Sequence, residues 1–85
     1  MEELKILRNE IDQIDDEIIK LLEKRFNISL KIGEIKKTYN LPIQDANREK
    51  ELITKNSNKI KNKEFLNAYL NILSSIIEES KKIQK

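Results

Sequence analysis

The chain has 85 residues, enough for one small domain, which we expect to span residues 1–85. It contains no cysteine and no histidine, which excludes disulfides and argues against zinc sites and histidine-activated nucleophiles. The net charge of +2 argues against nucleic-acid binding, and without a signal peptide or an apolar run of membrane-spanning length we expect a cytoplasmic protein with no membrane association.

The first predicted element is a long helix from about Glu2 to about Asn40, and Pro42 ends the helical pattern. Gly33 lies inside this helix, and because its neighbours keep the helical period, we interpret it as a site of close packing. Steps of three and four residues trace one apolar stripe, which consists of Leu4, Leu7, Ile11, Ile14, Ile18, Leu21, Ile28, Ile32, Ile35 and Tyr39.

Arg25 interrupts the apolar stripe between Leu21 and Ile28. A buried charge destabilises a protein unless something pairs with it. The partner is either a carboxylate of the protein, in a structural ion pair, or a ligand, and the sequence leaves both open. Lys36 lies eleven residues further on and faces nearly the same way, roughly 16 Å away. It is either a second cation of the same site or simply solvated.

The second predicted helix runs from Ala46 to about Asn56, with Asp45 as its N-cap. Asp45, Arg48 and Glu49 share one face with Leu52, which marks that face as inward. These charged residues either line a site or form the local ion pairs that are common at helix starts.

The third predicted helix runs from about Glu64 to the end of the chain. Ser80 and Gln84 continue the stripe that its apolar residues define. Either these polar side chains face a site, or the end of the helix frays and is exposed. The apolar residues of this helix are Leu66, Tyr69, Leu70, Leu73, Ile76 and Ile77.

The length of the first helix indicates a dimer. A helix of this span is roughly 55–60 Å long, whereas a compact chain of this size is only about 30 Å across. Two shorter helices cannot cover the whole apolar stripe. We therefore expect an all-α fold in which three helices, one long and two shorter, form an intertwined homodimer. Arg8, roughly 25 Å before Arg25, could then reach a site across the interface, or it could simply be solvated.

The arginines are distributed differently from the lysines. The chain has fourteen lysines but only three arginines, and all three lie on or beside an inward face. Arginine's planar fork is suited to binding carboxylate or phosphate when it is partly buried. Inward cations, one carboxylate and neutral amide and hydroxyl donors suit a small polyanion. Chemistry in such a pocket would proceed by positioning and electrostatic stabilisation, without nucleophile, metal or cofactor.

Four segments, in this order along essentially the whole chain, resemble the all-helical AroQ class of chorismate mutase. They are "LRNEIDQIDDEIIKLLEKR", "KIGEIK", "PIQDANRE" and "IIEESKKIQ". The resemblance implies the Claisen rearrangement of chorismate to prephenate, in phenylalanine and tyrosine biosynthesis. It also implies an intertwined homodimer with two equivalent sites and no cofactor.

The resemblance further implies a role for each polar residue. Arg25 would bind one substrate carboxylate, and Arg8 of the other subunit would bind the second. Lys36 would contact a carboxylate and the ether oxygen of the breaking bond, to which Gln84 would also donate. The ring hydroxyl would donate to Glu49, while Asp45 and Arg48 would line the pocket and Ser80 would help hold a carboxylate. The wall positions are Ile32, Leu52 and Ile77, whereas Lys81, at a position that is often apolar in the family, suggests a more open side.

Two alternatives remain at this point. Isochorismate-pyruvate lyase is similar in fold and in its cationic pocket, although "QDANRE" is closer to the mutases. A non-enzymatic dimeric helical adaptor would use Arg25 only to fix the register of the helices. The sequence also leaves open whether the chain is free-standing or fused to another enzyme.

Overall fold

The structure, a computed structural model, describes residues 1–85 and contains three α-helices and no strand. Helix α1 spans Glu2–Thr38 and α2 spans Ala46–Ser57, while α3 spans Leu66–Gln84 and follows a 3-10 turn, η1, at Lys63–Phe65. The predicted all-α class with three helices is confirmed. The expected bounds differ by one or two residues, because α1 ends before Asn40, α2 continues to Ser57, and residues 63–65 form a 3-10 turn instead of the start of α3.

Helix α1 ends in a Schellman motif. Asn40 adopts a left-handed conformation, with φ of 59°, which asparagine tolerates better than most residues. The N–H of Leu41 donates to the carbonyl of Lys36 at 2.7 Å, and the N–H of Asn40 donates to the carbonyl of Lys37 at 3.3 Å. Pro42 follows directly, so the chain turns away from the helix and leads to α2.

Asp45 caps α2 as the sequence predicted. Its backbone is extended, and its carboxylate accepts a hydrogen bond of 3.0 Å from the backbone N–H of Arg48. The helix therefore begins at Ala46, which fixes the direction in which the charged residues of its first turn project.

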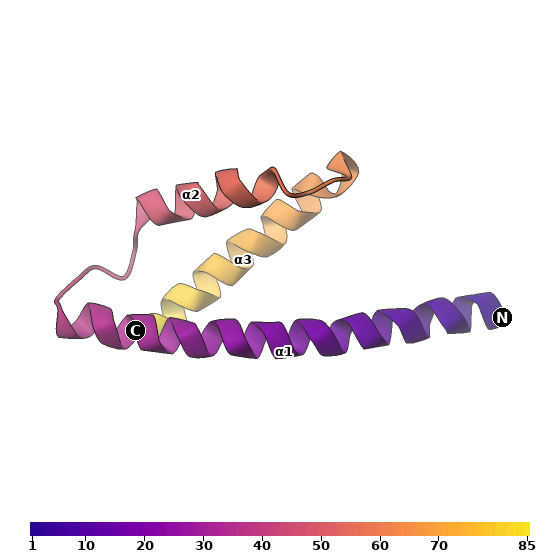
Figure 1. Cartoon of the computed structure of the whole chain (residues 1–85), viewed down its shortest axis with the longest axis horizontal. Helices are drawn as coiled ribbons and strands as arrows, with labels where there is room; N and C mark the ends of the chain where they lie inside the picture. Colours follow the sequence, from indigo (N-terminus) through magenta and orange to yellow (C-terminus); the bar gives the residue numbers. More distant parts are fainter.

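Helix α3 joins the other two helices. It packs against the C-terminal half of α1 and against α2, whereas the N-terminal end of α1 extends beyond the rest of the chain (Figure 1). The chain measures 56 × 25 × 15 Å, and its radius of gyration of 16.3 Å exceeds the roughly 12 Å of a compact chain of this length. No helix combines the length and the apolar character needed to cross a membrane.

The apolar stripe of α1 stays largely uncovered in the single chain. Only Leu73 and Ile77, both on α3, are buried apolar side chains. The stripe residues of the first half of α1 are each 44–63% exposed, namely Leu4, Leu7, Ile11, Ile14, Ile18 and Leu21. One chain therefore does not build a core large enough to cover its own longest helix.

Gly33 allows the end of α3 to approach α1, which confirms its interpretation as a site of close packing. A Cβ atom at this position would lie 2.5 Å from the backbone oxygen of Gln84 and 2.8 Å from its Cα atom. Any side chain here would push away the end of α3, where Ser80 and Gln84 lie.

Candidate functional site

A cavity of about 400 Å³ lies between the three helices and the connection that precedes α2. Its size is in the range of small-molecule sites. Seven of the eight polar residues singled out in the sequence line it, and Arg8 lies outside it, exposed near the start of α1. The cavity is lined by Arg25, Ile28, Ser29, Ile32, Lys36, Ile43, Asp45, Arg48, Glu49, Leu52, Ile77, Ser80, Lys81 and Gln84.

Arg25 contacts a hydroxyl group and no carboxylate. Its guanidinium donates to the Oγ atom of Ser80, a residue that is buried on α3. No acidic side chain of this chain lies within ion-pair distance of Arg25. An intrachain ion pair is therefore excluded as the reason for this arginine, and most of its N–H donors remain available to an anion in the cavity.

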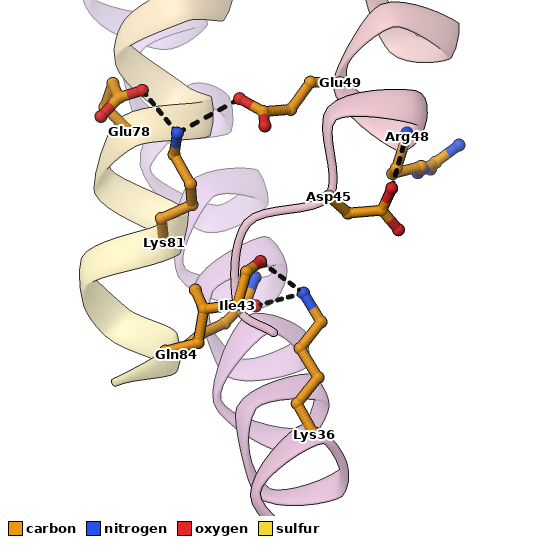
Figure 2. Close-up of polar contacts among 8 residues, drawn as sticks. All are labelled: Lys36, Ile43, Asp45, Arg48, Glu49, Glu78, Lys81 and Gln84. Carbon is orange, nitrogen blue, oxygen red and sulfur yellow. Dashed lines mark hydrogen bonds and ion pairs between the residues drawn. The ribbon is translucent and has the colours of Figure 1, made fainter. Parts of the chain in front are cut away.

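Lys36 joins α1 to the two segments that enclose one end of the cavity. Its Nζ atom donates to the backbone oxygen of Ile43 and to Oε1 of Gln84, both at 2.8 Å (Figure 2). Lys36 is thus not simply solvated. An ammonium group has three donors, of which these contacts use two, so one N–H remains for a ligand.

The same contact orients the amide of Gln84. Lysine can only donate, so the oxygen of this amide must face Lys36 and its NH₂ group must point elsewhere, where it has no protein acceptor. Helix α3 continues through Gln84, and Ser80 is buried, so the end of this helix is ordered by packing instead of fraying.

The charged residues of α2 point in different directions. The Arg48 guanidinium forms an ion pair of 2.7 Å with Glu51 and is about half exposed, so its charge is engaged in a local pair of the kind left open by the sequence. Asp45 holds the helix cap through one oxygen. Glu49 instead faces α3, with its side chain only 25% exposed.

Lys81 lies on the side of the pocket that the resemblance suggested would be more open, and there its side chain reaches from α3 to α2. Its Nζ atom lies 2.8 Å from Oε1 of Glu78 and 3.2 Å from Oε1 of Glu49, between the two carboxylates (Figure 2). The hydrogen bonds that Lys81 donates to Glu78 and then to Glu49 raise the pKa of Lys81, and the hydrogen bond and charge of Lys81 lower the pKa of Glu78. Both shifts favour the ionised forms of Lys81 and Glu78 near neutral pH.

Four residues that line the cavity were not predicted from the sequence to bind the substrate. They are Ile28, Ser29, Ile43 and Lys81. Ile28 and Ser29 lie three and four residues after Arg25, so helical spacing could have placed them on its face. Ile43 contributes a backbone oxygen from an irregular connection, for which no sequence signal exists. Lys81 was noted at a wall position, but its pairing with Glu49 depends on how α3 packs against α2.

The arrangement is suited to binding an anion. Four cationic side chains and two carboxylates line the cavity, together with the hydroxyl of Ser80 and the amide of Gln84. No group of three or more His, Cys, Asp or Glu residues is placed to hold a metal ion. The site can orient a small polyanion and stabilise negative charge on it through fixed donors.

Comparisons with known proteins agree with this geometry. A family model described as chorismate mutase type II matches residues 7–85. The chain is 54% identical over 55 residues to a bifunctional chorismate mutase/prephenate dehydratase of Aquifex aeolicus, an alignment that covers 65% of this chain and 15% of that protein. A similar bifunctional protein of Buchnera aphidicola is 42% identical over 79 residues, which cover 92% of this chain and 20% of that protein.

Two further proteins are similar over nearly their whole length. A chorismate mutase of Methanocaldococcus jannaschii is 33% identical over 86 residues, covering 100% of this chain and 87% of that protein. The solved structure of a conserved hypothetical protein from Pyrococcus furiosus has a TM-score of 0.79 and 45% identity, covering 96% of this chain and 95% of that one. The resemblance inferred from the four sequence segments is confirmed, and the chain belongs to the chorismate mutase type II family.

Proposed function

We propose that this protein catalyses the rearrangement of chorismate to prephenate, a precursor of phenylalanine and tyrosine. The observation that carries the proposal is that Arg25 and Lys36 line one cavity and neither has a carboxylate partner in the protein. The NH₂ group of Gln84, in the same cavity, has no acceptor in the protein. Membership of the chorismate mutase family supports it, as does a relative named chorismate mutase of which the chain covers 87%.

The reaction suits a site without acid, base or nucleophile. Within one molecule a carbon–oxygen bond breaks while a carbon–carbon bond forms, so no proton or other group is transferred to the protein. The enzyme must hold the flexible enolpyruvyl side chain over the ring and stabilise negative charge that grows on the ether oxygen. Donors that interact more strongly with the transition state than with the substrate raise kcat.

Lys36 and Gln84 fit the role of donors to the ether oxygen. The remaining N–H of Lys36 and the free NH₂ of Gln84 belong to two groups that already contact each other, so both can reach one acceptor. In this proposal the same N–H of Lys36 is shared between the ether oxygen and one carboxylate of the substrate, which the ammonium charge also attracts. Neither group needs to move a proton, because charge stabilisation alone lowers the barrier.

The other lining residues bind and orient the substrate. Arg25 binds a carboxylate through the donors that Ser80 does not use, and Ser80 helps to hold the same group. Glu49 accepts a hydrogen bond from the ring hydroxyl. Asp45 and Arg48 form the wall on the side of α2.

We further propose that the protein acts as an intertwined homodimer. The exposed apolar stripe on the first half of α1 matches the surface that a second copy of α1 would cover. In this assembly Arg8 of the second copy reaches the cavity and binds the second substrate carboxylate. The single chain otherwise leaves that carboxylate without a dedicated arginine.

The test is the loss of chorismate absorbance with purified protein, with the product identified by its chromatographic retention against authentic prephenate. Conversion to prephenate that Arg25→Ala abolishes, and that Lys24→Ala at the neighbouring exposed position leaves unchanged, supports the proposal. Formation of salicylate and pyruvate in a parallel assay with isochorismate, without conversion of chorismate to prephenate, would instead identify a lyase. If the protein forms a folded dimer but converts no chorismate, and if Arg25→Leu stabilises it, the protein is a helical adaptor.

A further inference from the structure

We infer that Lys81 is a positioning residue for the proposed reaction: its ammonium group holds one oxygen of Glu49 at the pocket wall, which leaves the other oxygen free for the ring hydroxyl of the substrate. This inference rests on the proposed function and extends it to a residue outside the set of substrate contacts.

The ion pair between Lys81 and Glu49 differs from the other ion pairs of the chain. The structure contains five, and four of them join residues three positions apart on one helix. Only the pair of Lys81 with Glu49 joins two helices, α3 and α2. Its side chains are 21% and 25% exposed, whereas the carboxylates of the other pairs are 56–70% exposed.

Glu78 keeps Lys81 in this position. It lies one turn before Lys81 on the same helix and contacts the Nζ atom at 2.8 Å, so the long lysine side chain is held at both carboxylates (Figure 2). Both glutamates use their Oε1 atoms, and Oε2 of Glu49 has no hydrogen-bond partner in the protein. That free oxygen belongs to a residue lining the cavity, so it can accept a hydrogen bond from a ligand hydroxyl.

The ammonium group of Lys81 also reduces the repulsion between the Glu49 carboxylate and a negatively charged substrate. The proposed substrate carries two negative charges, and an unpaired Glu49 carboxylate in the same cavity would repel it. Lys81 offsets that charge at short range and fixes the carboxylate in one orientation. Because the ring hydroxyl is not part of the breaking bond, this contribution should act equally on substrate and transition state, which affects KM more than kcat.

The experiment compares Lys81→Met with Lys82→Met in the full chain. Lys82 is a matched control, because it is the next residue, it pairs with Glu79 at 3.1 Å, and it lies outside the cavity. Lys81→Met should raise KM for chorismate about fivefold and leave kcat within about twofold, whereas Lys82→Met should change neither. Lys81→Arg, which restores a cation at the same position, should recover part of the loss.

A double-mutant cycle tests whether Lys81 acts through Glu49. If it does, adding Lys81→Met to Glu49→Gln should raise KM no further. Independent, additive effects of the two substitutions would overturn the inference, as would equal behaviour of Lys81→Met and Lys82→Met.

A titration of the lysine Nζ groups by NMR provides a readout that needs no catalysis. Glu49→Gln should lower the pKa of Lys81 relative to the wild type, since Glu49 is one of the two groups that raise it. An unchanged pKa of Lys81 would overturn the inference even if the enzyme is active. A wild-type protein that binds and converts no chorismate would overturn the proposed function itself, and this inference with it, whatever the titration shows.

Discussion

Lys36 and Gln84 contact each other at 2.8 Å across the junction of the first and last helices, 48 residues apart in the sequence. The contact ties the end of α3 to the end of α1, and it determines which face of the Gln84 amide is turned toward the cavity. The two groups proposed to stabilise the ether oxygen therefore hold each other in place before any substrate arrives. Such preorganisation avoids reorientation of dipoles during the reaction.

Removal of Lys36 should mainly slow the chemical step. We expect Lys36→Ala to lower kcat by about 10²-fold or more, since a donor to the developing charge is lost. Arg8→Ala should instead mainly raise KM, because a substrate carboxylate is bound in the ground state and the transition state alike. Steady-state kinetics with Lys37→Ala, at the adjacent exposed position, as control would test this. Equal and mild effects of both substitutions on kcat/KM would contradict the assignment.

The charge state of residue 84 should set the pH dependence of the reaction. Gln84 does not titrate, so the wild type should need no acid pH, and an optimum well below pH 5 would count against its role. Gln84→Glu would place a carboxylate beside Lys36, which favours the ionised form and removes the donor. Its kcat should therefore fall at neutral pH and recover as the pH is lowered. Profiles of kcat against pH for both proteins provide the measurement.

A methyl group at position 33 should disturb the site by displacing the end of α3. In an exposed helix interior Gly→Ala stabilises a protein by about 1 kcal/mol. At Gly33 the added Cβ would lie 2.5 Å from the backbone of Gln84, so we expect Gly33→Ala to lower the melting temperature and kcat together. Lys31→Ala, at an exposed position of the same helix, is the control for helix propensity. A more stable and fully active Gly33→Ala protein would contradict the close approach.

The stabilising effect of Lys81 should be confined to a window of pH. The pKa of Glu78 is lowered from 4.5 by the hydrogen bond and the charge of Lys81, so its contribution is present above pH 4.5 and is lost as the pH falls through its folded value. The pKa of Lys81 is raised from 10.5, so its contribution is present below pH 10.5 and is lost as the pH rises through its folded value. Melting temperatures of the wild type and Lys81→Met should therefore differ most between these limits and converge beyond them. A difference that does not vary with pH would assign the effect to packing.

Helical spacing predicted the elements of the site better than its contacts. The apolar stripe, the Asp45 cap and the close packing at Gly33 all follow from patterns within one helix, and the structure contains each of them. The backbone oxygen of Ile43 at Lys36 and the reach of Lys81 to Glu49 did not follow. These contacts depend on side-chain rotamers and on an irregular connection, which are set by how the helices pack and not by the periodicity of any one of them.

The assembly of the site from two chains can be tested by mixing two defective proteins. If Arg8 of one copy serves the cavity that contains Arg25 of the other, neither Arg8→Ala nor Arg25→Ala homodimers contain an intact site. A mixed dimer contains one intact site of two, so unfolding and refolding an equimolar mixture should restore about a quarter of the wild-type kcat/KM, as random pairing makes half of the dimers mixed.

Two controls define the result of the mixing experiment. Ile11→Lys should give a monomer in light scattering and abolish the recovery, since it places a charge on the exposed apolar stripe, whereas Asn9→Lys adds the same charge off the stripe and should have no effect. A mixture that stays as inactive as its components, while remaining dimeric, would mean that Arg8 does not reach the partner's cavity. The second carboxylate would then have to be bound within one chain, where Arg48 is the other arginine that lines the cavity.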